Sequence, residues 1–147
     1  MKGGLFVDTM DRKEFLSLLG ISSAAFVLSQ CLAGCQPMNA IPTAPSNVDF
    51  TLDLTNAAYS ALKSNGGYVY NDGIIVARTI SGIYVAVSQY CTHAAGTVVY
   101  DANINDFYCP VHGSVYSTTG SVIQGPAGKS LVKYNTSLTG NSLRVYS

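Results

Sequence analysis

The chain has 147 residues, room for one compact domain, and its eight basic and eight acidic residues give a formal net charge of zero. A balanced charge argues against nucleic acid or another polyanion as a partner. Ten tyrosines and many valines and isoleucines favour strands over helices, so the composition predicts a small all-β domain.

The first 35 residues have the pattern of an export signal. Basic residues precede an uncharged run over 15–35, an order that is typical of a secretory signal peptide. The run ends in Leu-Ala-Gly-Cys, which resembles a bacterial lipobox and implies that Cys35 is lipidated and begins the mature protein. An uncleaved transmembrane helix is the alternative, because 21 uncharged residues can span a bilayer.

Residues 11–16 are similar to a twin-arginine export motif in which Lys13 takes the second basic position. A start at Met10 would place this motif at the N-terminus, so the sequence leaves the start codon open. Residues 36–46 contain three prolines among small polar residues and are predicted to form an extended linker. The predicted division is therefore a signal peptide over 1–35, this linker, and a domain over 47–147.

Alternating apolar residues and turn signals divide the domain into short elements. In chain order, the sequence predicts a strand over 50–54, a short helix over 56–65, strands over 68–70 and 74–79 joined by a tight turn at 71–73, a strand over 83–89, short strands over 103–108 and 115–117, and closing strands over 131–134 and 143–146. Most of the chain is thus expected to be antiparallel sheet.

The two histidines of the chain lie beside the two cysteines of the domain. Cys91 is followed two residues later by His93, and Cys109 is followed three residues later by His112. Two thiolates and two imidazoles suit either zinc or an iron–sulfur centre. A disulfide between the two cysteines is a further possibility in an oxidising compartment.

The residues around these two cysteine–histidine pairs resemble the signature of a known family. Cys-x-His, fifteen residues, then Cys-Pro-x-His-Gly-Ser-x-Tyr is similar to the signature of the Rieske iron–sulfur family. The similarity covers about 83–134. It implies a small Rieske-type domain of stacked antiparallel sheets with a cluster-binding subdomain of two loops, and a Rieske-type 2Fe-2S cluster. The implied ligands, two thiolates on one iron and two imidazoles on the other, are Cys91, Cys109, His93 and His112.

The resemblance also assigns roles around the cluster. Ser114 and Tyr116 stand where hydroxyl groups donate to a bridging sulfide and to a cysteine sulfur, and Pro126 stands in a proline loop beside the cluster. Without the family, these residues are a turn hydroxyl, a packed aromatic and a loop proline. Gly96 and Val111 occupy positions where respiratory Rieske proteins carry further cysteines, so the disulfide between the loops is expected to be absent.

The Rieske resemblance implies one-electron transport, and the N-terminal pattern predicts an exported lipoprotein on the periplasmic side of a bacterial membrane. The implied partner is a cytochrome, a quinol-oxidising subunit or a reductase, and the chain is not expected to be an enzyme on its own. The alternative is the Rieske subunit of a quinol-oxidising, cytochrome bc-like complex. Structural zinc and a disulfide-stabilised adhesion module are further alternatives, whereas a Rieske oxygenase would need a second domain with a mononuclear iron site.

Overall fold

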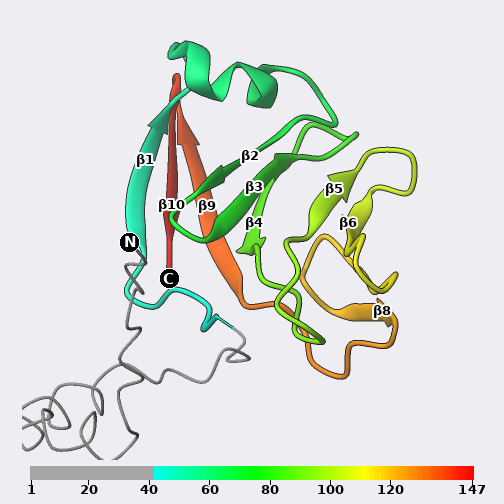
Figure 1. Ribbon diagram of the computed structural model, residues 1–147. Coiled ribbons are helices and arrows are strands. Elements are labelled where there is room, and N and C mark those ends of the chain that lie inside the picture. Colours follow the sequence, from blue (N-terminus) through cyan, green and yellow to red (C-terminus); the bar gives the residue numbers. More distant parts are fainter. Residues whose placement is uncertain (1–41) are drawn as a thin grey trace, which may run out of the picture. The chain divides into compact units, whose positions relative to one another are not determined.

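The computed structural model describes residues 42–147. The predicted signal peptide, Cys35 and the first part of the predicted linker lie outside the described residues. The described chain forms two antiparallel sheets and one short 3-10 helix, η2 (Ala57–Lys63), as Figure 1 shows. The predicted all-β fold of antiparallel sheets is confirmed.

Six strands form the larger sheet. Their spatial order is β1 (Asp49–Asp53), β10 (Ser142–Tyr146), β9 (Lys133–Thr139), β4 (Tyr84–Ser88), β3 (Ile74–Arg78) and β2 (Tyr68–Asn71), with antiparallel pairing throughout. The first and last strands of the described residues thus lie side by side. The turn between β2 and β3 uses positive φ angles at Asp72 (47°) and Gly73 (80°). Both angles are those of the tight hairpin turn that Asn-Asp-Gly predicts.

The smaller sheet carries the two loops of interest. Its order is β5 (Val99–Asp101), β6 (Asp106–Tyr108), β7 (Val115–Tyr116) and β8 (Val122–Gln124), again antiparallel. It is inserted between β4 and β9 of the larger sheet, so the chain leaves the larger sheet after β4 and returns to it in β9. The predicted two-loop subdomain corresponds to this insertion.

The third strand is buried on both faces. Ile74 and Val76 lie in the core beneath η2, together with Leu62, whereas Ile75 and Ala77 lie in a second core shared with the smaller sheet. Successive strand residues point to opposite faces, so one continuous apolar strand can serve both cores. The second core also holds both domain cysteines, so the packing of the two sheets fixes the site.

Several predicted boundaries were wrong. The strand predicted over 103–108 begins only at Asp106, because residues 102–105 form a turn in which Asn105 is left-handed, with a φ of 56°. The Asn105 side chain accepts a hydrogen bond from the Tyr100 hydroxyl at 2.6 Å, which fixes this turn. The predicted helix over 56–65 is the shorter 3-10 helix, with Asn56 as its N-cap. Strand β9 continues to Thr139, beyond the predicted end at 134.

Candidate metal centre

Two loops that have the same backbone closure carry the four predicted ligands. In the first, the Cys91 N–H donates to the Gly96 carbonyl at 2.7 Å, and the Ala95 N–H donates back to the Cys91 carbonyl. In the second, the Cys109 N–H donates to the Ser114 carbonyl at 2.8 Å, and the Gly113 N–H donates back to the Cys109 carbonyl. Each cysteine is therefore held by its own loop at the end of a strand or bridge.

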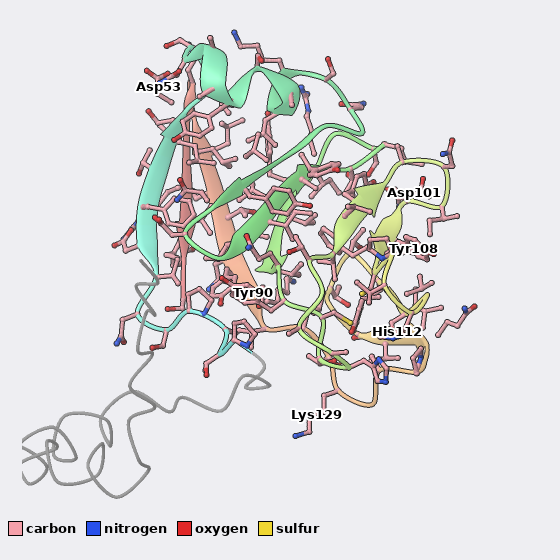
Figure 2. The ribbon with its side chains drawn as sticks, in the orientation of Figure 1. Asp53, Tyr90, Asp101, Tyr108, His112 and Lys129 are labelled. Atoms are coloured by element: carbon pink, nitrogen blue, oxygen red, sulfur yellow. The ribbon has the colours of Figure 1, made fainter. Side chains whose placement is uncertain are left out.

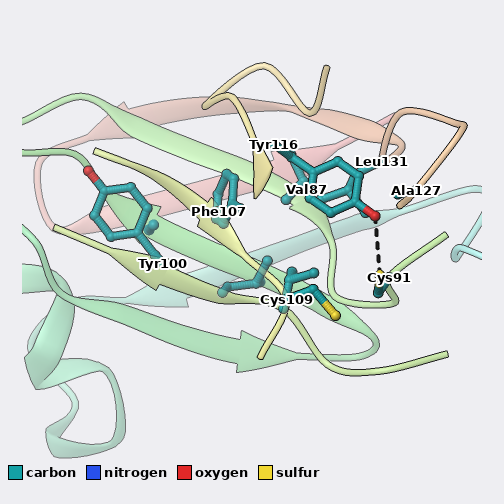
Figure 3. Close-up of a cluster of buried hydrophobic side chains, with 11 residues drawn as sticks. Val87, Cys91, Tyr100, Phe107, Cys109, Tyr116, Ala127 and Leu131 are labelled. Atoms are coloured by element: carbon teal, nitrogen blue, oxygen red, sulfur yellow. Dashed lines mark hydrogen bonds between the residues drawn. The ribbon is translucent and has the colours of Figure 1, made fainter. Parts of the chain in front are cut away.

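The two cysteines are buried and lie in one core. Cys91 and Cys109 are each 1% exposed and belong to the cluster of apolar side chains in Figure 3. Both are free thiols, so the disulfide reading is not borne out in the structure. Buried thiols beneath two loops can serve as thiolate ligands when a metal and hydrogen-bond donors supply compensating charge.

The two histidines lie on the opposite, exposed side of the loops. The rings of His93 and His112 approach edge to face, with centroids 4.8 Å apart and planes at 89°. His112 lies at the same end of the domain as Lys129 in Figure 2. The fold therefore brings together two residue pairs from separate loops, with sulfur inside and imidazole outside.

The donor set can be tested against the predicted metals. Within residues 42–147, no three His, Cys, Asp or Glu side chains surround one common point closely enough to hold a single ion. A structural zinc ion takes about four such ligands around one centre. A two-iron cluster takes only two protein ligands on each iron. The residues present fit that second arrangement.

The Tyr116 hydroxyl lies on the sulfur side of the site. Its hydroxyl oxygen lies 3.2 Å from the Cys91 sulfur and accepts the Thr92 N–H at 3.2 Å. The Thr92 hydroxyl also lies 3.2 Å away, but it donates its one hydrogen to the Lys129 carbonyl at 2.6 Å. The tyrosine hydrogen is therefore available to an anionic Cys91 sulfur.

The hydroxyl hydrogen of Ser114 is likewise available to another acceptor. Its side chain is fully buried, and its oxygen accepts the Ala127 N–H at 3.1 Å. Because the oxygen already accepts from the backbone, its own hydrogen points elsewhere and remains available to a buried acceptor. Pro126 itself is exposed, and the next residue, Ala127, packs in the core with both cysteines. The predicted proline loop thus contacts the site through Ala127.

The two thiols have opposite pKa shifts. Burial raises the pKa of the Cys109 thiol, and the adjacent Cys91 sulfur raises it further. Burial also acts to raise the pKa of Cys91, but the Tyr116 hydroxyl and the backbone N–H groups of His93 and Ala94 outweigh it and lower that pKa. Donors aimed at a sulfur stabilise its anionic form. The site is therefore prepared for thiolate on at least the Cys91 side.

Sequence reasoning missed two residues of this network. Thr92 joins the Tyr116 hydroxyl to the Lys129 carbonyl, and Ala127 orients the Ser114 hydroxyl. A hydroxyl residue between a candidate cysteine and histidine was the available signal for Thr92. Nothing in the local sequence distinguishes Ala127, because its role comes from a backbone N–H group.

Comparison with known proteins gives a family and several relatives. The model of the Rieske [2Fe-2S] domain matches residues 53–135, more than half of the chain. Iron–sulfur subunits of the cytochrome b6-f complex are 32% identical over 76 residues in Chlorobaculum thiosulfatiphilum and 35% identical over 83 residues in Synechococcus sp. (strain JA-3-3Ab). These matches cover 52% and 56% of this chain but only 42% and 45% of the relatives.

Solved structures show the same fold. The plasma membrane Rieske protein from the cyanobacterium Synechocystis PCC 6803 is 31% identical, with a TM-score of 0.52 over 61% of this chain and 95% of that one. The ferredoxin of carbazole 1,9a-dioxygenase from Nocardioides aromaticivorans IC177 is 19% identical, with a TM-score of 0.51 over 73% of this chain and 98% of that one. The second likeness concerns the fold alone.

Proposed function

Because the chain belongs to the Rieske [2Fe-2S] family and is a Rieske-type electron carrier with a 2Fe-2S cluster, we propose that the two buried thiols and the two exposed imidazoles described above hold that cluster. When bound, such a cluster takes up and releases one electron at a potential above that of clusters held only by thiolates. The proposed ligands are Cys91, His93, Cys109 and His112.

The observation that carries this proposal is the division of the site into a buried and an exposed half. Cys91 and Cys109 are closed off by the core, whereas the rings of His93 and His112 meet at the surface. A partner protein can approach the imidazole edges, and the protein interior keeps water from the sulfur atoms. The chain's residues then hold and shield the cluster, and no bond-making step is required of them.

The test is electron paramagnetic resonance on the purified full-length chain in detergent, before and after reduction with dithionite. We expect a Rieske-type signal only after reduction, and the Cys109→Ala variant should lack both the signal and the bound iron. A colourless sample that contains zinc and gives no signal would refute the assignment. So would a full signal in the Cys109→Ala variant.

We propose further that the carrier is exported and anchored through Cys35. Support comes from the basic and apolar pattern of residues 1–35 and from their lipobox-like end. A twin-arginine route fits this cargo, because it carries folded proteins and clusters are usually assembled in the cytoplasm. Within residues 42–147, no helix is long and apolar enough to cross a bilayer.

Lipid labelling in a bacterial host distinguishes the anchor from an uncleaved helix. The unsubstituted chain is expected to incorporate labelled fatty acid and to lose residues 1–34, because the lipobox cysteine becomes the first mature residue. The Cys35→Ala variant should lose the label and keep its leader. Cys31→Ala is the matched control, since Cys31 lies in the same apolar run and should leave labelling intact. An unlabelled, full-mass parent chain would support the transmembrane alternative.

The curated relatives are named iron–sulfur subunits of the cytochrome b6-f complex, which favours a second candidate, the Rieske subunit of a membrane redox complex. The free carrier and the subunit differ in what stays attached after mild solubilisation. A stable co-purifying cytochrome-containing partner would favour the subunit, whereas a monomer of uniform mass that still carries its cluster would favour the free carrier.

Tyr116→Phe should lower the midpoint potential modestly without loss of the cluster. The variant removes the only hydrogen that Tyr116 can give to the Cys91 sulfur, and such a bond favours the more negative, reduced state. The aromatic packing remains because Phe has the same ring. Redox titration followed by electron paramagnetic resonance measures the shift, with Tyr134→Phe as a control for a buried tyrosine that instead donates to the Pro45 carbonyl. An unchanged potential would leave Tyr116 as a packing residue.

A further inference from the structure

The two metal-binding loops touch at Gly96 and Val111. A Cβ atom added to Gly96 would lie only 2.5 Å from the Val111 Cγ2 atom, closer than real Cβ atoms come to their neighbours. The same point is 3.2 Å from the Cys109 sulfur. One methyl group of the second loop therefore fills the place of the side chain that the first loop lacks.

The backbone at Gly96 does not itself require glycine. Gly113, in the other loop, has a φ of 78°, in the left-handed region that side chains rarely adopt, whereas Gly96 is outside that region. An alanine at position 96 could thus take the observed backbone conformation. Only the contacts with Val111 and the Cys109 sulfur oppose it, so residues 96 and 111 are complementary in shape.

We propose that Gly96 and Val111 form a steric interlock that holds the two loops together and keeps the ligands in register. This inference rests on the proposed function, since the loops carry the proposed ligands. The interlock occupies a place close to the size of a covalent link, because the Gly96 Cβ position and the Val111 Cβ atom are 3.3 Å apart and need to separate by only a few tenths of an ångström. Cβ atoms of disulfides are separated by about 3.5–4.5 Å.

The interlock lies beside the Cys109 sulfur. Val111 is 53% exposed, so part of its side chain faces solvent while its Cγ2 methyl lies against the first loop. The Gly96 Cβ position, which that methyl fills, is 3.2 Å from the Cys109 sulfur. Because the contact is van der Waals and not covalent, thiol reductants should neither open the loops nor release the cluster.

A pair of substitutions tests the interlock on the full-length chain. Gly96→Ala should lose most of the bound iron and melt several degrees lower, because the added methyl group collides with Val111. Adding Val111→Ala should restore most of the iron and the parent resonance spectrum, since the remaining contacts, at 3.2 and 3.3 Å, need shifts of only a few tenths of an ångström. A double variant no better than Gly96→Ala, or full iron in Gly96→Ala alone, would overturn the proposal.

Two controls match these changes. Gly128→Ala adds the same methyl group where nothing lies within 4 Å, and Val132→Ala removes the same atoms from a valine that is 48% exposed. Neither control should change the iron content. Loss of iron in both would mean that the loops respond to any small change, which contradicts a specific interlock.

A second measurement needs no cluster. In the apo form of Gly96→Cys/Val111→Cys, oxidised glutathione should take up the two thiol hydrogens and leave a disulfide between positions 96 and 111, located by peptide mapping. A bridge to Cys91 or Cys109, or no bridge, would contradict the interlock geometry. If the bridge forms while the unsubstituted chain holds no cluster, the interlock geometry stands and the proposed function fails.

Discussion

The midpoint potential of the cluster is expected to fall when His112 is replaced by cysteine, by on the order of 100 mV or more. A thiolate brings a full negative charge where a neutral imidazole brings none, and this charge disfavours the added electron. His112 is exposed on the outer side of its loop, so the substitution leaves the buried core unchanged. Redox titration monitored by electron paramagnetic resonance gives the potential of each variant that retains its cluster.

A matched control separates ligation from nearby charge. Gln124→Glu adds one negative charge at the same end of the domain, because the Gln124 amide donates to the Gly113 carbonyl at 3.3 Å. This side chain is exposed, so water and salt screen its charge and the expected shift is small. An unchanged potential in His112→Cys with the cluster intact would remove His112 from the ligand set.

Sequence patterns predicted those elements whose signals are local. The hairpin of β2 and β3 depends on Asn-Asp-Gly, and the observed positive φ angles at Asp72 and Gly73 are those that this tripeptide favours. Both cysteine–histidine pairs could be recognised because the members of each pair are only two or three residues apart in one short loop. The Tyr116 hydroxyl lies 3.2 Å from the Cys91 sulfur, and the Ser114 hydroxyl is buried and accepts the Ala127 N–H.

The parts that the sequence did not predict depend on tertiary contacts. Strands β5 and β8 have three residues each, too few to give a periodic pattern, and they exist because β6 and β7 pair with them. Polar residues after Tyr134 extend β9 because β10 lies beside them. Thr92 and Ala127 act through bonds to residues more than ten positions away in the chain. Local sequence preferences contain no information about partners that lie so far away in the chain.

Phe107→Ala is expected to destabilise the domain by about 3–5 kcal/mol. Phe107 is fully buried, pairs directly with Tyr116 across β6 and β7, and packs edge to face against Tyr100 at 5.5 Å (Figure 3). Its removal leaves a cavity that two short strands cannot close by local repacking. Because a small domain is stable by only about 5–15 kcal/mol, a large share of the total would be lost. Urea unfolding of the full-length chain measures this change.

The same substitution links the core to the site, because the ring of Phe107 supports the tyrosine whose hydroxyl contacts Cys91. Loosening Tyr116 should therefore release iron at lower urea concentrations than in the parent chain, ahead of the unfolding of the larger sheet. Phe107→Leu keeps most of the volume and should cost less, and Val132→Ala, at an exposed position, should change stability by less than about 0.5 kcal/mol. Equal losses in Phe107→Ala and Val132→Ala would show that the core beneath the cysteines does not support the site.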